Sequence, residues 1–269
     1  MKDSNKKNLF IIIPGNPGMT YAYDDFIRSL KMSQKDDVFY CHQHLGQGRD
    51  DGFFPSLTID DLIQDHTDFI ERKIGQYKDH NLILIGHSLG GLLGLEMFQK
   101  KLIPIHKMFL LCPFIELSTP NKWFVKGLKK KSFNKGLKGF VNIVNRAPSP
   151  IQKPIQKFFN LKNHGPQIFE DFSRENFKYN FFSLLRKYPQ HYENLNLIQW
   201  LRDFTTQDEK KKLFFVFAKN DPWSPRKLYN RLPQSIEKKF DHRFDHNFCL
   251  DPSQCNLMAS LINKNLFNF

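Results

Sequence analysis

The sequence predicts an α/β protein in which helices cover both faces of a mostly parallel β-sheet. Short apolar runs of about four to seven residues recur along both ends of the chain, and this length suits strands better than buried helices. Segments with helical apolar spacing separate most of these runs, and such alternation is typical of parallel sheets. The predicted apolar strands cover residues 9–13, 38–41, 82–85, 108–112 and 212–218.

Apolar residues that recur every three or four positions predict the helices between these strands. In the first helix Phe26, Ile27 and Leu30 should face the core. Thr58 is a candidate N-cap for the second, because its hydroxyl can accept from an amide of the first helical turn. A last strand and a terminal helix should close the fold. The predicted ranges are 21–30 and 58–77 for these two helices, 239–244 for the last strand and 252–263 for the terminal helix.

Regular alternation stops between residues 114 and 201. This stretch has helical fragments and a proline-rich break, but no comparable strand. We therefore expect a core of residues 1–113 and 202–269, with 114–201 inserted as a mostly helical segment, called the cap below.

The cap carries most of the chain's formal net charge of +13. Residues 117–169 contain eleven Lys and Arg residues and no Asp or Glu. Two interpretations stay open: a solvated lid over an apolar pocket, or a basic surface for an anionic partner. Nucleic acid is the weakest choice of partner, because no nucleic-acid-binding module accompanies the lysines. The aromatic and basic residues that would meet a substrate or lipid surface are Trp123, Phe124, Lys129, Lys130 and Lys131.

The four cysteines and the N-terminus suggest a cytoplasmic protein. The cysteines are scattered, with no C-x-x-C, so we expect reduced thiols rather than a zinc site or a disulfide framework. The first apolar run, at residues 9–13, is too short for a signal peptide or a membrane span. The cysteines are Cys41, Cys112, Cys249 and Cys255.

A strand–turn–helix motif at residues 81–95 is the strongest functional signal. Gly86-His87-Ser88-Leu89-Gly90 matches G-x-S-x-G, with an apolar strand before it and a helical stripe after it. In this context the turn exposes the Ser88 hydroxyl as a candidate nucleophile, and small residues at positions 86 and 90 avoid collisions with the adjoining backbone. The alternative is an ordinary turn whose serine caps the helix.

A rigid turn, Pro14-Gly15-Asn16-Pro17-Gly18, follows the first strand. A turn after a parallel strand lies at the carboxyl edge of the sheet, where active sites form. A plain connecting loop is the alternative, and the glycine pattern of a phosphate-binding loop is missing. If Ser88 is a nucleophile, the main-chain amides of Asn16 and Leu89 are candidate oxyanion donors, since Pro17 has no N–H.

An acid and a histidine follow in the chain order that a nucleophile-elbow fold requires. Asp221 comes just after the strand at 212–218, where an orienting carboxylate is needed; its alternative role is to start an aspartate–proline turn. His246 opens the loop after the last predicted strand and can reach Ser88. We favour it over His242, which falls within that predicted strand.

A second histidine pattern, His42-Gln43-His44, lies in a glycine-containing loop after the second strand. H-x-H can contribute to a metal site, but no acidic or cysteine ligand accompanies it nearby in the sequence. We interpret the pair as loop structure.

With these motifs in hand, the chain resembles the α/β-hydrolase superfamily and, within it, the lipid droplet-associated serine hydrolase family. The resemblance rests on Ile13-Pro-Gly-Asn-Pro-Gly, Gly86-His-Ser-Leu-Gly, Asn220-Asp-Pro-Trp-Ser-Pro and His246-Asn-Phe. These motifs span most of the chain outside the cap. The chain starts directly at the strand before the Pro-Gly turn, without a leading hairpin, so we expect about six parallel strands.

The resemblance implies Ser88 as nucleophile, Asp221 as charge-relay acid and His246 as general base, with an ester-bearing lipid as substrate. This chemistry needs no metal or organic cofactor. The alternative is a hydrolase-fold protein of weak or no activity that binds lipid surfaces through its basic cap. If the basic cap is a docking surface rather than a lid, we expect peripheral contact with an anionic membrane or a lipid droplet surface.

Overall fold

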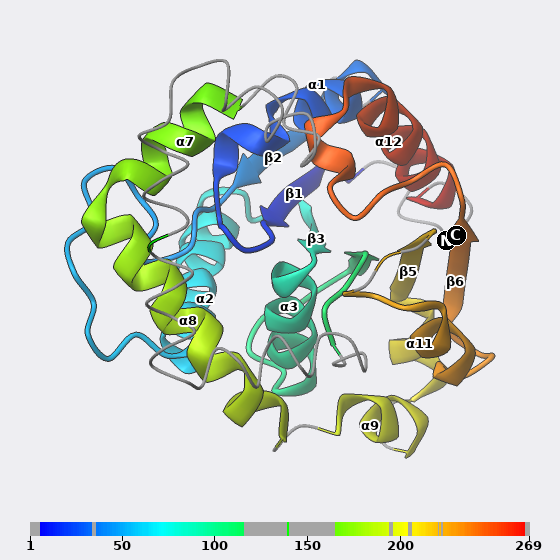
Figure 1. Cartoon of the computed structure of the whole chain (residues 1–269). Helices are drawn as coiled ribbons and strands as arrows, with labels where there is room; N and C mark the ends of the chain where they lie inside the picture. Colours follow the sequence, from blue (N-terminus) through cyan, green and yellow to red (C-terminus); the bar gives the residue numbers. More distant parts are fainter. Residues whose placement is uncertain are drawn as a thin grey trace.

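A single parallel sheet forms the centre of the molecule. The structure is a computed structural model that describes residues 6–33, 36–115, 139, 165–193, 196–203, 206–219, 221 and 223–266. Six strands pair in the order β2-β1-β3-β4-β5-β6, and every pairing is parallel (Figure 1). The predicted fold class and the number of strands are therefore confirmed. The strands are β1 (Asn8–Ile13), β2 (Val38–Cys41), β3 (Asn81–His87), β4 (Lys107–Leu111), β5 (Leu213–Ala218) and β6 (Glu237–Asp241).

The last strand ends earlier than predicted. β6 ends at Asp241, not at Phe244, because the Asp241 carboxylate accepts from the main-chain amide of Arg243 and the Asp241 carbonyl accepts from the amide of Phe244. These bonds turn the chain out of the sheet. His242 consequently lies in an exposed turn rather than within the strand.

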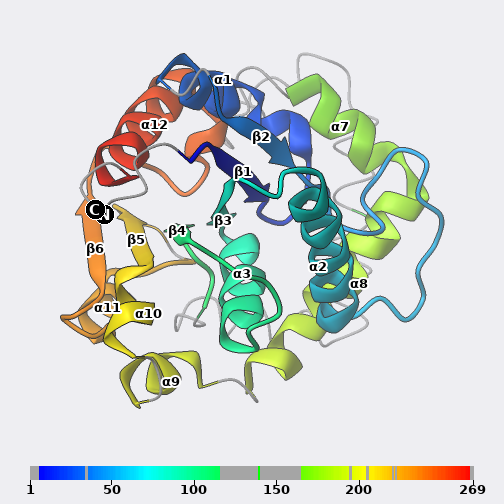
Figure 2. The ribbon, with the colours of Figure 1, turned by 180° about the vertical axis from the view of Figure 1, so that it is seen from behind.

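Helices cover both faces of the sheet, as Figures 1 and 2 show from opposite sides. One apolar cluster joins one face of the sheet to α2, α3, α9 and α11, and a second joins the other face to α1 and α12. The central strands are apolar on both faces and fully buried, as expected for a parallel sheet. The helices named so far are α1 (Asp24–Ser33), α2 (Ile59–Gln76), α3 (Leu89–Gln99), α9 (Leu197–Asp203), α11 (Arg226–Arg231) and α12 (Pro252–Leu266).

Two helices start where the sequence gives a local capping signal. Thr58 caps α2 in a reciprocal capping box with Asp61, which confirms the predicted N-cap. Thr206 and Glu209 form the same arrangement at the start of α10. Helix α10 covers Gln207–Lys211. Two further short elements in the described residues are the 3-10 helices η1 (Thr20–Tyr23) and η2 (Phe248–Leu250).

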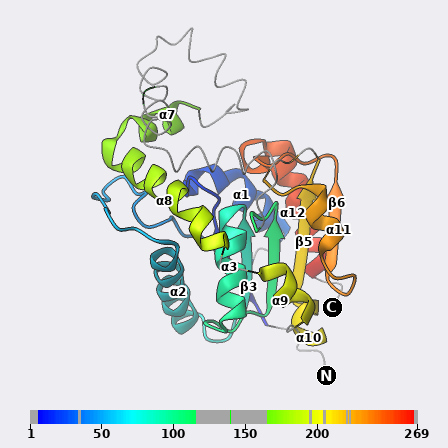
Figure 3. The same cartoon turned by 60° about the horizontal axis from the view of Figure 1, so that its bottom comes forward.

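Among the residues that the structure describes, three helices belong to the predicted cap range, 114–201. They are α7 (Gly165–Ser173), α8 (Glu175–Glu193) and α9, which extends past the range to Asp203. Figure 3 shows α7 on the side of the sheet toward which the strand arrows point. Leu184 of α8 and Leu201 of α9 are fully buried in the core, so this part of the segment packs on the central sheet. The boundaries of the cap stay a prediction.

A buried acid links α8 to α3. Glu96 on α3 is fully buried and accepts a hydrogen bond of 2.6 Å from His191 Nε2 on α8. Its second carboxylate oxygen lies 3.5 Å from Lys100 Nζ. A buried carboxylate needs such partners, because an unpaired charge in the interior is costly. The contact holds the end of α8 against the helix that follows β3.

Close backbone packing at the turn from β3 to α3 explains its two flanking glycines. A Cβ on Gly90 would lie 2.1 Å from the Ile13 carbonyl oxygen, and a Cβ on Gly86 would lie 2.5 Å from the Gly90 carbonyl oxygen. These neighbours are main-chain atoms and cannot rotate away. The absence of side chains therefore allows α3 to start directly against the end of β1.

This packing predicts a large stability difference between two Gly→Ala variants. Gly90→Ala should lower the free energy of unfolding by at least about 3 kcal/mol, because the backbone must shift to relieve the collision. Gly75→Ala, at an exposed site on α2 with open space around it, should raise that free energy by about 0.5 kcal/mol. Urea denaturation of both variants tests this expectation. Equal effects would show that the turn is not tightly packed.

Candidate active site

The candidate site lies where the strands end. The 14–18 turn follows β1, Ser88 follows β3, Asp221 comes three residues after β5, and His246 lies in the loop after β6. All strands are parallel, so these ends lie along one edge of the sheet. The fold thus brings together residues that are up to 232 positions apart in the chain.

Ser88 occupies a strained backbone conformation between β3 and α3. Its φ of 51° and ψ of −115° lie outside the regions that L-residues usually adopt. Main-chain bonds hold it there: its amide donates to the Leu111 carbonyl at 3.0 Å, and its carbonyl accepts from Phe114 at 2.9 Å. The side chain makes no helix-capping bond, so the alternative of a capping serine is wrong.

His246 bridges Ser88 and Asp221. Its Nε2 lies 2.9 Å from Ser88 Oγ, and its Nδ1 lies 2.7 Å from Asp221 Oδ2. A carboxylate only accepts, so Nδ1 carries the ring proton and Nε2 is free to accept from the serine hydroxyl. His242, the rival considered from the sequence, is exposed and makes neither contact.

The two oxygens of Asp221 have separate partners. Oδ2 accepts from His246, while Oδ1 accepts from the amides of Trp223 and Ser224 at 2.8 and 3.1 Å. The turn-forming role and the histidine-orienting role considered from the sequence therefore coexist in one side chain. Because Asp221 is buried, these bonds fix the direction of its carboxylate.

The 14–18 turn packs directly beside Ser88, the candidate nucleophile. A Cβ added to Gly15 would lie 3.1 Å from Ser88 Cβ, which leaves no room for a side chain. The Gly15 amide is already used, because it donates to the Tyr23 hydroxyl at 2.7 Å. The amide of Leu89, the first residue of α3, has no carbonyl partner within its helix. Asn16 and Leu89 thus stay the candidate oxyanion donors.

A neighbouring loop braces the turn from the other side. Gln47 accepts from the Gly18 amide and donates from Nε2 to Asn16 Oδ1 at 2.9 Å. The ring of His44 lies so close to Gly18 that a Cβ there would be 2.6 Å away. Sequence reasoning interpreted His44 as loop structure but gave Gln47 no role, although both lie in the glycine-containing loop after β2.

The H-x-H pair is part of a buried polar cluster. His44 Nδ1 lies 2.9 Å from His66 Nε2 of α2, and His42 Nε2 lies 3.0 Å from Asp65 Oδ2. Burial lowers the pKa of His44 to about 3 and that of His66 well below its usual value. Both rings are therefore neutral at neutral pH.

His87, the second residue of the serine motif, is a further buried histidine that sequence reasoning did not assign. Its Nδ1 lies 2.6 Å from the Tyr23 hydroxyl, and its Nε2 donates to the His246 carbonyl at 2.8 Å. Burial lowers its pKa to about 3. The signal in the sequence was the motif itself, which places His87 at the end of β3, directly before Ser88.

One group of potential metal ligands occurs among the described residues. Cys112, Asp221 and His246 bring their ligand atoms within 4.8 Å of one another. Burial raises the pKa of the Cys112 thiol well above its usual value, so the thiol stays protonated and is a poor ligand. Asp221 and His246 already satisfy each other.

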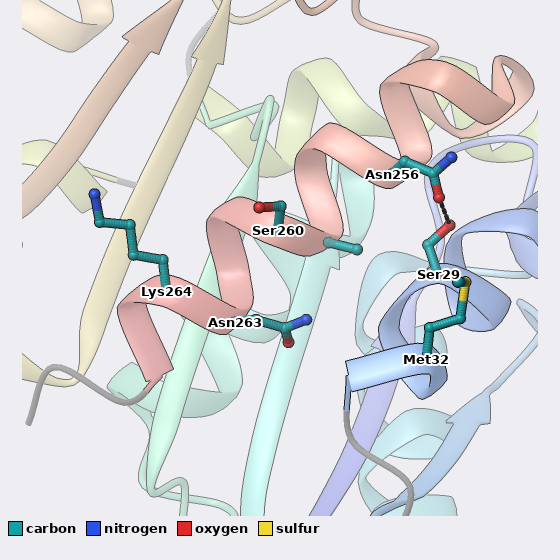
Figure 4. Close-up of a pocket in the computed structure, with 7 residues that line it drawn as sticks. Ser29, Met32, Asn256, Ser260, Asn263 and Lys264 are labelled. Atoms are coloured by element: carbon teal, nitrogen blue, oxygen red, sulfur yellow. Dashed lines mark hydrogen bonds between the residues drawn. The ribbon is translucent and has the colours of Figure 1, made fainter.

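A surface cavity lies apart from the residues of this candidate site. Trp123, Phe124 and residues 129–131 are outside the described residues. A cavity of about 440 Å³ lies between α1 and α12 (Figure 4), where Ser29 donates to Asn256. It contains none of the candidate catalytic residues. Within the ranges that the structure describes, no helix has the length and apolar character of a membrane span.

The fold and the serine turn define an α/β hydrolase. Solved structures of this class superpose on nearly the whole chain: an α/β hydrolase from a Medee basin deep-sea metagenome has a TM-score of 0.67 at 16% identity, covering 100% of this chain and 92% of that one. The enol-lactonase of Burkholderia xenovorans has a TM-score of 0.62 at 12% identity, covering 98% and 93%. At such identities the likeness shows the fold alone.

The chain belongs to the lipid-droplet associated hydrolase family, whose sequence profile matches residues 6–251. Among its relatives, the lipid droplet-associated hydrolase of Gallus gallus is 25% identical over 291 residues, which cover 97% of this chain and 86% of that protein. The Homo sapiens protein of the same name is 25% identical over 279 residues, covering 90% and 81%. The family expected from the sequence motifs is confirmed.

The buried histidines predict a loss of stability in mild acid. His87 titrates near pH 3 when folded and near 6.5 when unfolded, so below pH 6.5 the unfolded chain binds a proton that the folded chain does not. The contribution of the neutral His87 to the free energy of unfolding is fully present above pH 6.5 and is lost as pH falls toward 3. Between pH 7.5 and 5 the loss from this residue should be about 2 kcal/mol.

Urea denaturation of the wild type and of His87→Gln across this pH range isolates the effect of His87. The variant should lose less stability than the wild type over the same interval, because glutamine does not titrate. Parallel stability curves for the two proteins would contradict the assignment of a neutral, buried His87.

Proposed function

We propose that the protein is a serine hydrolase that cleaves carboxylic esters, with Ser88 as nucleophile, His246 as general base and Asp221 as the orienting acid. The observation that carries the proposal is the unbroken pair of hydrogen bonds from Ser88 Oγ through His246 to Asp221, at 2.9 and 2.7 Å. Chain order, strand-end positions and the strained serine backbone agree with it.

In the first half of the reaction, Ser88 Oγ attacks the ester carbonyl carbon as its proton moves to His246 Nε2. The carbonyl oxygen becomes an oxyanion, which the amides of Asn16 and Leu89 would stabilise. Asp221 holds the ring in the tautomer that accepts this proton and stabilises the imidazolium. When the C–O bond breaks, His246 returns the proton to the leaving alkoxide, which departs as the alcohol.

In the second half, water attacks the acyl-serine. His246 takes a proton from the water, a second oxyanion forms, and collapse releases the carboxylic acid while the proton returns to Ser88 Oγ. Each group thus ends in its starting state. Thioesters and lactones would use the same residues, since their reaction also passes through an oxyanion.

An ester-bearing lipid is the substrate class that we propose. The support is membership of a family described as lipid-droplet associated hydrolases, together with relatives that carry the same name. The basic, aromatic-containing sequence at 117–169 suits a protein that works at an anionic lipid surface.

Serine labelling and ester turnover test the catalytic assignment. Ser88→Ala should abolish labelling by a fluorophosphonate probe and lower kcat for p-nitrophenyl butyrate by at least about 10⁴-fold. Asp221→Asn should lower kcat by about 10³-fold or more, because the histidine loses its orienting acceptor. Ser260→Ala, at an exposed site on α12, is the matched control and should behave like the wild type.

The same measurement separates an enzyme from a lipid-binding scaffold. If wild type and Ser88→Ala hydrolyse short-chain and long-chain esters equally, the catalytic proposal is wrong and the binding role is favoured. Labelling that persists in Ser88→Ala would place the reactive serine elsewhere.

For the cap we propose electrostatic docking on a lipid surface. Lysines near an anionic membrane each contribute about 1 kcal/mol of attraction, which salt weakens. Binding to phosphatidylserine vesicles should therefore fall with rising salt and fall further when Lys129, Lys130 and Lys131 are changed to Gln. Turnover of a soluble ester should stay near the wild-type value. Equal binding to neutral phosphatidylcholine vesicles would contradict docking through charge.

A further inference from the structure

We propose that Tyr23 and His87 are positioning residues that join the oxyanion turn to the loop of the catalytic histidine. This inference rests on the proposed function, which assigns the 14–18 turn and His246 to the same reaction. Neither Tyr23 nor His87 would touch the substrate. Their role would be to keep the two loops aligned on either side of Ser88.

Three hydrogen bonds form a continuous path between the two loops. The Gly15 amide donates to the Tyr23 hydroxyl at 2.7 Å, the Tyr23 hydroxyl lies 2.6 Å from His87 Nδ1, and His87 Nε2 lies 2.8 Å from the carbonyl oxygen of His246. The path thus starts one residue before Asn16 and ends on the main chain of the catalytic histidine. Ser88 follows His87 directly in the chain.

The chemistry of the end groups sets the direction of every bond. The His246 carbonyl can only accept, so His87 carries its proton on Nε2. A neutral ring then has a bare Nδ1, which accepts from the Tyr23 hydroxyl. That hydroxyl has used its proton, and its oxygen accepts from the Gly15 amide. No alternative assignment satisfies all three contacts while His87 is neutral.

Burial makes this path rigid. Tyr23 and His87 are exposed by only 2% and 4%, and Gly15 is buried beside them. Burial also lowers the pKa of His87 to about 3, with the nearby His246 adding to the effect, so the ring stays neutral through the working pH range. Removal of one member would leave a buried donor or acceptor without a partner, which is more costly than loss of an exposed bond.

Packing keeps the rings in place. A Cβ on Gly15 would lie 3.2 Å from His87 Nδ1, so the turn rests directly on this ring. The His87 ring also contacts Phe248 in an edge arrangement, with centroids 5.1 Å apart. The 14–18 turn is therefore fixed by Tyr23 and His87 on one side and by His44 and Gln47 on the other. A small displacement of the turn would weaken stabilisation of the oxyanion more than binding of the ester.

Tyr23→Phe tests the role of the path in catalysis. We expect kcat for p-nitrophenyl butyrate to fall at least tenfold while KM changes less than twofold. Tyr77→Phe is the matched control: it also removes one tyrosine hydroxyl bond, to Tyr40 at 2.8 Å, and should leave both constants unchanged. A variant with the wild-type kcat, or one whose loss lies only in KM, would overturn the proposal.

A double-mutant cycle tests whether the two residues act as one unit. His87→Gln keeps an amide donor toward the His246 carbonyl but removes the ring nitrogen that accepts from Tyr23. The double variant should lose no more kcat than the more impaired single variant. Losses that multiply would show two independent, merely structural effects and overturn the path. Thermal melts of all variants check that each is folded at the assay temperature.

An NMR readout keeps the inference separable from the proposed function. In ¹⁵N spectra of the wild type, His87 should appear as the neutral Nε2–H tautomer from pH 7 down to pH 5, and Tyr23→Phe should change its Nδ1 shift and speed hydrogen exchange at the Gly15 amide. A protonated ring at pH 5, an Nδ1–H tautomer, or exchange at Gly15 unaltered by Tyr23→Phe would overturn the path. A wild type that hydrolyses no ester but shows these signals would refute the proposed function and leave the path intact.

Discussion

The site depends on the positive φ of Ser88. At φ 51° and ψ −115° the chain reverses between β3 and α3 and directs Oγ away from the sheet, toward His246. The conformation costs energy, and the surrounding structure offsets that cost by main-chain bonds to Leu111 and Phe114. It also requires Gly90, whose missing side chain lets α3 start against the Ile13 carbonyl. Disturbing this turn would displace Ser88 and the helix that carries the Leu89 amide.

Hydrogen bonds between buried and half-buried side chains keep the rest of the site in place around that turn. Asp221 uses one oxygen to fix its own loop and the other to bind the His246 ring, so the positions of the loop and the ring are not set independently. His87 and His44 are buried and neutral, and they can hold loops without adding charge beside the reacting atoms. The buried interior has a low dielectric constant, which strengthens these hydrogen bonds, so a few of them are enough to hold the loops in place.

Local patterns in the sequence predicted the fold because each element carries its own signal. The apolar run before Ser88, the N-cap at Thr58 and the inward Phe26 all appear where local sequence signals predicted them. The predicted end of β6 was wrong, because the Asp241 carboxylate accepts from the main-chain amide of Arg243. This local hydrogen bond takes the place of further strand pairing. Motif order gave the candidate residues Ser88, Asp221 and His246. No pattern in the sequence pointed to Tyr23, because its contact with His87 forms only when η1 folds back beside that residue.

The rate at which a fluorophosphonate inactivates the protein, measured against pH, tests the central claim most directly. If His246 activates Ser88, the rate should rise with the deprotonation of a single group and reach a plateau, and His246→Gln should lower the plateau by at least about 10³-fold. Mass spectrometry should locate the adduct on Ser88. A rate that is independent of pH between 5 and 9, or equal in His246→Gln, would contradict the account.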